Sequence, residues 1–233
     1  LSGNEIVAYT NNSPDTLNQV FYHLYFNAFQ PNSGMDVRSR TIADPDSRVL
    51  DRINKLKPDE IGKYDIKSIT CNGVPVKNST IQGTILSVEL NKGILPGETV
   101  RFSMDYSCQI PVQIRRTGRY NKENVAYSMS QWYPKMAEYD RNGWATDPYI
   151  GREFYGVWGK FDIYLTLPDS FKVAGTGNIV SQETKIQNQG KKKKPIKTTT
   201  YHMQADNVHD FMWAADPHYQ IDTLKAKDGL ILI

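Results

Sequence analysis

The sequence predicts an all-β protein with mostly antiparallel, saddle or sandwich-like sheets and one partly helical insertion near residues 31–63. Several segments alternate apolar and polar residues with a period of two, which is the pattern of a half-buried strand. The chain holds 14 Tyr, 8 Phe and 4 Trp, and aromatic side chains are enriched in strands. Turn-forming pairs such as Asn72-Gly73 separate the alternating segments, as is typical of antiparallel strands.

The first part of the chain predicts two strands, over residues 5–10 and 17–27, with a turn over residues 11–15. In residues 20–26 both alternating sets are largely apolar or aromatic. A strand with this composition is covered on both of its faces. We therefore expect residues 20–26 to be a buried strand.

The next strands are expected over residues 69–71, 74–76, 84–90 and 100–106. Asn72-Gly73 predicts a tight hairpin between the first two of them. Pro96-Gly97 predicts a turn before residues 100–106, whose even positions are apolar or aromatic and whose odd positions are polar. This last segment is expected to be a half-buried strand.

The predicted insertion, residues 31–63, contains paired charges and lacks the period of two. Asp46-Ser47 could cap a helix that continues to about Leu56, before Pro58, because Asp and Ser side chains accept hydrogen bonds from the first turn of a helix. We expect this segment to be partly helical and to lie between two strands.

The second half of the chain predicts a strand over residues 161–167 and a long hairpin formed by residues 179–184 and 198–203. Four consecutive lysines, residues 191–194, lie between the two arms of this hairpin. We interpret them as a solvated tip. The alternative, a basic binding patch, would need further basic residues around it.

The overall composition excludes some classes of partner. The net charge of +3 is small for 233 residues, so nucleic acid is not expected as a partner. No stretch approaches the apolar length of a membrane span. Cys71 and Cys108 are expected to be free thiols, although two cysteines alone leave their pairing open. The sequence begins without Met or a signal-like segment; export therefore stays open, with a secreted or periplasmic location slightly preferred.

Residues 131–177 hold three of the four tryptophans, interspersed with prolines, glycines and charges. An irregular segment with so much aromatic area either packs on a scaffold or contributes to a site. Four carboxylates lie in this segment: Glu138, Asp140, Asp147 and Glu153. A glycosidase would need two of them to converge. We expect them instead to cap turns and to pair with Arg141 and Arg152.

The motifs of the common hydrolases are missing. No two of the four histidines are four residues apart, so the chain has no His-Glu-x-x-His zinc helix. It also lacks a Cys-x-x-Cys pair, a Gly-x-Ser-x-Gly elbow and a phosphate-binding glycine loop. His209-Asp210 is not expected to be a catalytic pair, because adjacent residues of a strand point to opposite faces.

Taken in order along the chain, several motifs resemble the N-terminal domain of the aminopeptidase N family of zinc metallopeptidases, the gluzincins. Residues 5–27 look like the first hairpin of that family. Ser130-Gln131-Trp132-Tyr133-Pro134 is similar to its Thr/Ser-Gln stretch before a proline. The other matching segments are residues 154–159, 161–168, 173–177 and 208–215.

The resemblance implies a mostly antiparallel β domain that is not catalytic alone, followed in the parent enzyme by a zinc-binding catalytic domain. It implies no cofactor in this chain, zinc in the parent enzyme, the catalytic domain as partner and a peptide as substrate. It places residues 1–225 in the β domain and residues 226–233 in the link to the catalytic domain. The apolar end at residues 229–233 is accordingly expected to continue into a longer chain.

The resemblance also nominates site residues. Gln131 matches the first glutamine of the family's stretch, whereas Tyr133 stands where the family carries a Gln or Glu that binds the substrate amine. Glu138 is a further acidic candidate for the cleft. Four aromatic residues are expected on the interdomain surface: Trp132, Trp144, Tyr149 and Phe154.

A second hypothesis, from the class of binding modules, is a carbohydrate- or peptide-binding β-sandwich of a secreted protein. It would use Trp132, Trp144 and Tyr149 as an exposed stacking platform.

Overall fold

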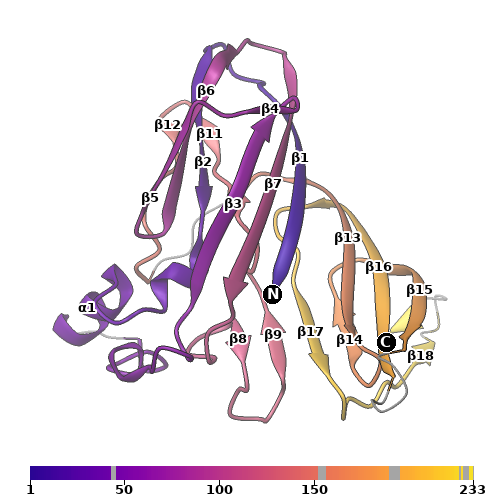
Figure 1. The fold of residues 1–233 in the computed structure, drawn as a ribbon. Coiled ribbons are helices and arrows are strands. Elements are labelled where there is room, and N and C mark those ends of the chain that lie inside the picture. Colours follow the sequence, from indigo (N-terminus) through magenta and orange to yellow (C-terminus); the bar gives the residue numbers. More distant parts are fainter. Residues whose placement is uncertain (43–45, 152–155, 189–194, 226, 228–230, 233) are drawn as a thin grey trace.

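The computed structural model describes residues 1–42, 46–151, 156–188, 195–225, 227 and 231–232. Over these residues the chain forms antiparallel sheets together with a single α-helix and two short 3-10 helices. Figure 1 shows two sheets in the upper half of the view and the remaining strands below and beside them. The expected all-β fold is confirmed.

The first sheet has β7 among its central strands. Its strands, in spatial order, are β1 (Ser2–Thr10), β7 (Thr99–Gln109), β3 (Lys63–Cys71) and β4 (Val74–Pro75). Every second residue of β7 from Val100 to Cys108 is buried, and the intervening residues are exposed or half-buried. The predicted alternation is therefore confirmed, and it follows from the two faces of a pleated strand.

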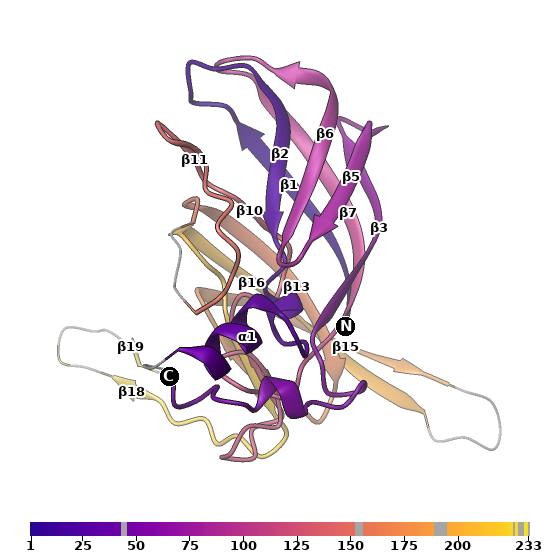
Figure 2. The same ribbon diagram turned by 90° about the vertical axis from the view of Figure 1, so that its left-hand side faces the viewer.

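The second sheet packs against the first. Its strands, in spatial order, are β10 (Lys135–Met136), β2 (Leu17–His23), β6 (Ile85–Ile94) and β5 (Asn78–Gln82). Tyr22 of β2 meets Phe102 of β7 edge to face, with ring centroids 6.4 Å apart. This contact crosses from one sheet to the other, so the two sheets form a sandwich, which can be followed in Figure 2.

The strands β1 and β2 do not form the expected first hairpin. β1 pairs with β7, and β2 pairs with β6, so residues 11–15 carry the chain from one sheet to the other. The side chain of the fully buried Asn11 holds this crossing, because its Nδ2 donates to the carbonyl oxygens of Ile94 at 3.0 Å and Asp15 at 2.7 Å. The amide thus satisfies two backbone acceptors at the point where the chain crosses between the sheets.

Three-dimensional packing also shortens the second predicted strand. β2 ends at His23, and a 3-10 helix, η1 (Tyr25–Ala28), follows it. Tyr25 and Phe26 are 1% and 0% exposed. The apolar residues on both alternating positions therefore reflect burial around a tight turn rather than a strand covered on both faces.

The hairpin at Asn72-Gly73 is confirmed, with β3 and β4 on its two sides. Asn72 and Gly73 have φ angles of 51° and 79°, which is the left-handed conformation that a two-residue hairpin of this type requires. Cys71 and Cys108, on β3 and β7, are both free thiols.

The second half of the chain adds two further sheets and two short hairpins. One sheet consists, in spatial order, of β14 (Lys172–Gly175), β17 (Trp213–Asp216), β9 (Tyr127–Met129) and β8 (Gly118–Arg119). The other consists of β13 (Gly159–Pro168), β16 (Ile196–Val208) and β15 (Asn178–Gln187). The short hairpins are β11 (Tyr139–Asp140) with β12 (Gly143–Trp144), and β18 (Leu224–Lys225) with β19 (Ile231–Leu232).

The long hairpin predicted around the lysine run is present as β15 and β16, which pair in antiparallel register. Residues 191–194, expected at its tip, lie outside the described residues. β15 forms the edge of its sheet, and all ten of its residues are exposed.

The insertion is partly helical as predicted, but its helix lies elsewhere. α1 (Gly34–Thr41) follows Ser33, whose Oγ accepts a hydrogen bond from the backbone N–H of Asp36 at 3.2 Å. After Asp46 the chain makes turns and one short 3-10 helix, η2 (Ile53–Lys55). Asp46 accepts a hydrogen bond from the backbone N–H of Arg48 at 3.0 Å, as a cap would, but Leu50 has a φ angle of 41°, so the backbone does not continue as the expected helix.

Two groups of buried residues hold these elements together. The larger one extends from Leu17 to Ala215 and includes side chains of both sandwich sheets and of the second half of the chain. The smaller one lies under the insertion: Tyr25, Ala28, Phe29, Met35, Val49, Ile53, Ile114 and Tyr149. The insertion therefore has a core of its own, closed by Ile114 and Tyr149.

Candidate functional site

The segment that follows β9 carries the candidate cleft residues. Gln131 stands at a sharp turn, with a φ angle of 54°. A left-handed conformation costs a residue other than glycine about 1–3 kcal/mol and persists where the surroundings impose it. The side chain is 7% exposed, and its Oε1 has no hydrogen-bond partner among the described residues. Gln131 thus combines backbone strain with a buried acceptor that lacks a donor.

Trp132 packs into the interior of the chain. Its Nε1 donates to the carbonyl oxygen of Phe211 at 3.1 Å, and its ring meets Trp213 edge to face at 6.0 Å. Only 8% of the residue is exposed. This indole anchors the turn at residue 131 to the chain around residues 211–213, and it is not available as the surface residue that the resemblance suggested.

Tyr133 is buried next to a carboxylate. Its hydroxyl donates to Oδ1 of Asp210 at 2.9 Å. Burial and then the charge of Asp210 raise the pKa of Tyr133 far above its ordinary range. The phenol therefore stays protonated and acts as a fixed donor to Asp210.

Lys135 completes this polar cluster, and sequence reasoning missed it. Its Nζ donates to the carbonyl oxygen of His209 and lies 3.8 Å from Oδ1 of Asp210. The residue is 7% exposed; burial lowers its pKa, while Asp210 acts in the opposite direction. Gly156 makes room for this ammonium group, because a Cβ there would lie 2.5 Å from Lys135 Nζ.

His23 lies opposite Lys135 in the β2–β10 pair. Burial lowers the pKa of His23 to about 4, so its imidazole is neutral at pH 7 beside the lysine. Its ring stacks on Tyr25 with centroids 5.6 Å apart. The histidine is therefore part of the packing that holds Lys135 in place.

Glu138 lies apart from this cluster. It is half-buried, and burial followed by the charge of Asp140 raises its pKa. Among the described residues, no hydrogen bond joins its side chain to Gln131 or Tyr133. The structure therefore brings Tyr133, Lys135 and Asp210 together, but it does not add Glu138 to them.

The remaining aromatic candidates occupy separate surroundings. Tyr149 is 1% exposed and belongs to the small core under the insertion. Trp144 is half-buried and packs on Tyr139 at 5.1 Å, and Phe154 lies outside the described residues. Trp132, Trp144 and Tyr149 therefore do not form the exposed stacking platform of the second hypothesis.

The described residues offer no donor set for zinc. Among them, no three His, Cys, Asp or Glu side chains lie close enough together to hold a metal ion, and zinc needs three or four such ligands. No helix in the described ranges is long and apolar enough to cross a membrane. Within the segment from Gln131 to Lys135, the side chains of Tyr133 and Lys135 form hydrogen bonds to the loop at residues 209–210.

No protein-family model and no curated protein matches the sequence. Among solved structures, the chain is similar to crystal structures of an M1 zinc metallopeptidase from Deinococcus radiodurans and of a mutant of that enzyme. A further similar structure is the mutant bound to a Tyr-Ser-Ala substrate. Each has a TM-score of 0.50 and 16% sequence identity, over 91% of this chain and 37% of that chain. At this identity the similarity shows an aminopeptidase-like fold, and the chain spans little more than a third of its neighbours' length.

Proposed function

We propose that this chain is the non-catalytic β domain of a zinc metallopeptidase of the aminopeptidase type. In that protein it would line one wall of the substrate cleft and dock the catalytic domain. The observation that carries the proposal is the fold: 91% of the chain matches about a third of an M1 zinc metallopeptidase. Zinc would be bound by the catalytic domain, because the described residues of this chain lack a donor set.

Gln131 is the residue that we propose for contact with the substrate. Its Oε1 is an unpaired acceptor, and a free amino end of a peptide is a charged donor. A hydrogen bond between the two would relieve the cost of the unpaired oxygen, which is about 1–3 kcal/mol for a buried polar group. Since Oε1 has no solvent contact in this chain, the proposal requires residues 131–138 to shift when a peptide binds.

Tyr133 and Lys135 have a supporting role in this proposal. Both are bonded to the loop at residues 209–210, so they fix the segment that carries Gln131. The hydroxyl of Tyr133 donates its hydrogen bond to Asp210. We therefore do not assign to Tyr133 the amine-binding role that its position suggested. Glu138, half-buried and with a raised pKa, stays a candidate for a second contact farther along the cleft wall.

The experiment compares substrates in the full-length protein that the gene encodes. Gln131→Ala should lower kcat/KM for a peptide with a free amino end by about tenfold or more, the value of a hydrogen bond to a charged group. The same peptide with an acetylated amino end should show no such difference. Gln182→Ala, an exposed position on β15, is the matched control and should leave both rates unchanged.

Residues 1–233 expressed alone should retain no stoichiometric zinc and should release no product from an aminoacyl reporter. Chelator-sensitive cleavage by this fragment that persists through purification would contradict the non-catalytic role. An equal loss for free and acetylated peptides would contradict the role of Gln131 while leaving the domain assignment intact.

A further inference from the structure

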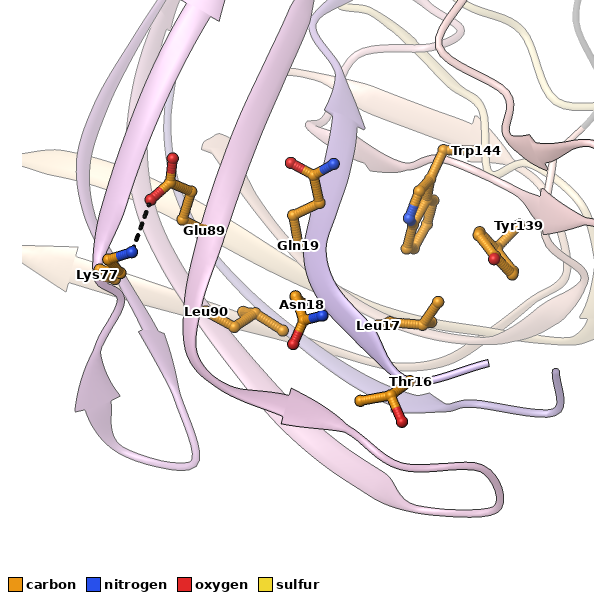
Figure 3. Close-up of a pocket in the computed structure, with 9 residues that line it drawn as sticks. All are labelled: Thr16, Leu17, Asn18, Gln19, Lys77, Glu89, Leu90, Tyr139 and Trp144. Carbon is orange, nitrogen blue, oxygen red and sulfur yellow. Dashed lines mark ion pairs between the residues drawn. The ribbon is translucent and has the colours of Figure 1, made fainter. Parts of the chain in front are cut away.

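A groove lies on the solvent-facing side of the β2–β6 pair, and no residue of the Tyr133–Asp210–Lys135 cluster lines it. It has a volume of about 640 Å³ and is bounded on one side by the β11–β12 hairpin. Figure 3 shows Tyr139 and Trp144 on that side, Asn18 and Gln19 in the middle, and the Lys77–Glu89 ion pair on the other side. The volume is that of a site for a small molecule or a short oligomer.

An irregularity in strand pairing opens the groove. Leu17 pairs with Ile94, but Gln19 pairs with Glu89, so one residue of β2 stands opposite four residues of β6. The extra residues leave the plane of the sheet at this point. Such bulges redirect side chains and often lie next to binding sites. The close approach also involves Gly93, because a Cβ there would lie 2.6 Å from Oδ1 of Asn18.

Trp144 is held rigidly at the edge of the groove. Its ring packs on three others: Tyr139 at 5.1 Å, Phe21 at 5.7 Å and Tyr9 at 6.2 Å. Tyr139 is fixed in turn, since its hydroxyl donates to Oδ2 of Asp15 at 2.8 Å. A preorganised aromatic wall lowers the entropy cost of binding.

Three polar side chains of the groove are free to bind a ligand: Asn18, Gln19 and Trp144. Among the described residues, neither the amides of Asn18 and Gln19 nor Nε1 of Trp144 form a hydrogen bond. In Figure 3 the nitrogen edge of the Trp144 ring faces the side on which Asn18 and Gln19 lie. The amides supply planar donors and acceptors, and the indole supplies a donor. The groove therefore presents both kinds of hydrogen-bonding group beside an aromatic surface.

The charges of the groove select against ionic ligands. Its lysine and glutamate lie 3.5 Å apart and neutralise each other. An extended peptide is also disfavoured, because strand addition needs an open sheet edge and both β2 and β6 have neighbours on either side. The ligand that fits is uncharged and carries several hydroxyl groups and an apolar ring face.

We propose that this groove binds a neutral oligosaccharide. One sugar ring packs against Trp144 and Tyr139, while its hydroxyl groups bond to the amides of Asn18 and Gln19 and to the Lys77–Glu89 pair. This inference is independent of the proposed peptidase role, because the groove is lined by none of the residues proposed for contact with the peptide and its binding requires no cleavage.

The test is a binding titration of residues 1–233 with neutral hexasaccharides of glucose, mannose, xylose and N-acetylglucosamine. Calorimetry and tryptophan fluorescence measure the binding. At least one should bind, with a Kd below about 10 mM. The double variant Asn18→Ala/Gln19→Ala should weaken that binding at least about tenfold, the value of one to two hydrogen bonds. Both substituted positions are exposed, and circular dichroism checks that the double variant stays folded.

Trp144→Phe, which keeps a ring in the aromatic cluster but removes the indole donor, should also weaken binding. Trp158→Ala is the control, since Trp158 is 62% exposed and does not line the groove. Failure of every hexasaccharide to bind, or binding that the double variant and Trp144→Phe leave unchanged, overturns the proposal. Binding of an anionic glycan or a peptide alone overturns the assigned ligand class.

Discussion

Glu5 lies on β1, in the first sheet, and one of its carboxyl oxygens, Oε2, has neither solvent contact nor a hydrogen-bond partner among the described residues. Burial raises the pKa of Glu5 to about 8. On β1, Glu5 is half-buried and its two neighbours are exposed. It therefore occupies one of the alternating positions that face the second sheet. The sequence predicts a strand over residues 5–10, but both alternating sets contain apolar residues, so it shows neither on which face Glu5 lies nor that its charge is suppressed there.

The free energy of unfolding should therefore depend on pH through Glu5. An unfolded carboxyl ionises near pH 4.5, whereas the folded one holds its proton up to about pH 8. The stabilisation by the neutral form is complete below pH 4.5 and is lost as the pH rises to about 8. The wild type should lose stability relative to Glu5→Gln across this window, at up to about 1.4 kcal/mol per pH unit.

Urea unfolding at several pH values measures this difference. The comparison with Glu5→Gln is needed because His23, whose pKa is lowered to about 4, makes the wild type less stable as the pH falls from 6.5 towards 4. Glu123→Gln, at an exposed turn, is the control and should track the wild type. Parallel pH profiles for the wild type and Glu5→Gln would contradict the buried, protonated state.

The polar cluster of the candidate site also shows that sequence does not reveal which polar side chains become buried. Gln131 and Tyr133 could be found from their sequence context, whereas Lys135 and Asp210 could not, because their partners lie more than 70 positions away along the chain. Pro134-Lys135 carries no signal of burial. Only the pairing of β10 with β2 takes the lysine into the interior.

At the scale of elements, α1 illustrates how a local signal competes with tertiary contacts. Ser33 caps the helix, and its Oγ donates in turn to the carbonyl oxygen of Ala28 at 2.6 Å. Asp36 accepts from the backbone N–H of Asn32 at 2.8 Å, which completes a reciprocal cap. The Ser-x-x-Asp pattern was available in the sequence. Asp46-Ser47 had the same residue types and Asp46 does accept from the backbone N–H of Arg48 at 3.0 Å, but the left-handed φ angle of Leu50, 41°, interrupts the helical backbone.

Replacing the cap should weaken this helix measurably. Ser33→Ala removes both hydrogen bonds of the hydroxyl and should lower the free energy of unfolding by about 1–2 kcal/mol. Urea unfolding with an unchanged m-value measures the loss, and amide exchange should quicken over residues 34–41. Ser181→Ala, at an exposed position of β15, is the control. An unchanged stability would show that the cap bonds are replaced by water at no cost.

At the scale of the whole molecule, one core joins the two halves of the chain. Residues of the sandwich, such as Phe102, share a cluster with residues of the second half, such as Met203 and Trp213. The continuity of this cluster indicates a single cooperative unit over residues 17–215, whereas the expected boundary near residue 225 stays a prediction.

A single core predicts a single unfolding transition. Fluorescence should report the exposure of the buried Trp132 and Trp213, and far-UV circular dichroism should report the loss of strands. The two curves should coincide, and the calorimetric and van't Hoff enthalpies should agree. Separate transitions, with the sandwich and the β13–β16–β15 sheet melting at different temperatures, would contradict this.

The sequence by itself determined the fold class, most strands and the tight turn at Asn72-Gly73, because these depend on the period of side chains and on local backbone preferences. Tertiary structure alone decided that β1 and β2 belong to different sheets, that Trp132 and Tyr149 are core residues, and that Trp144 borders a groove. Pairing partners and burial depend on contacts between distant segments, and a linear pattern does not encode them.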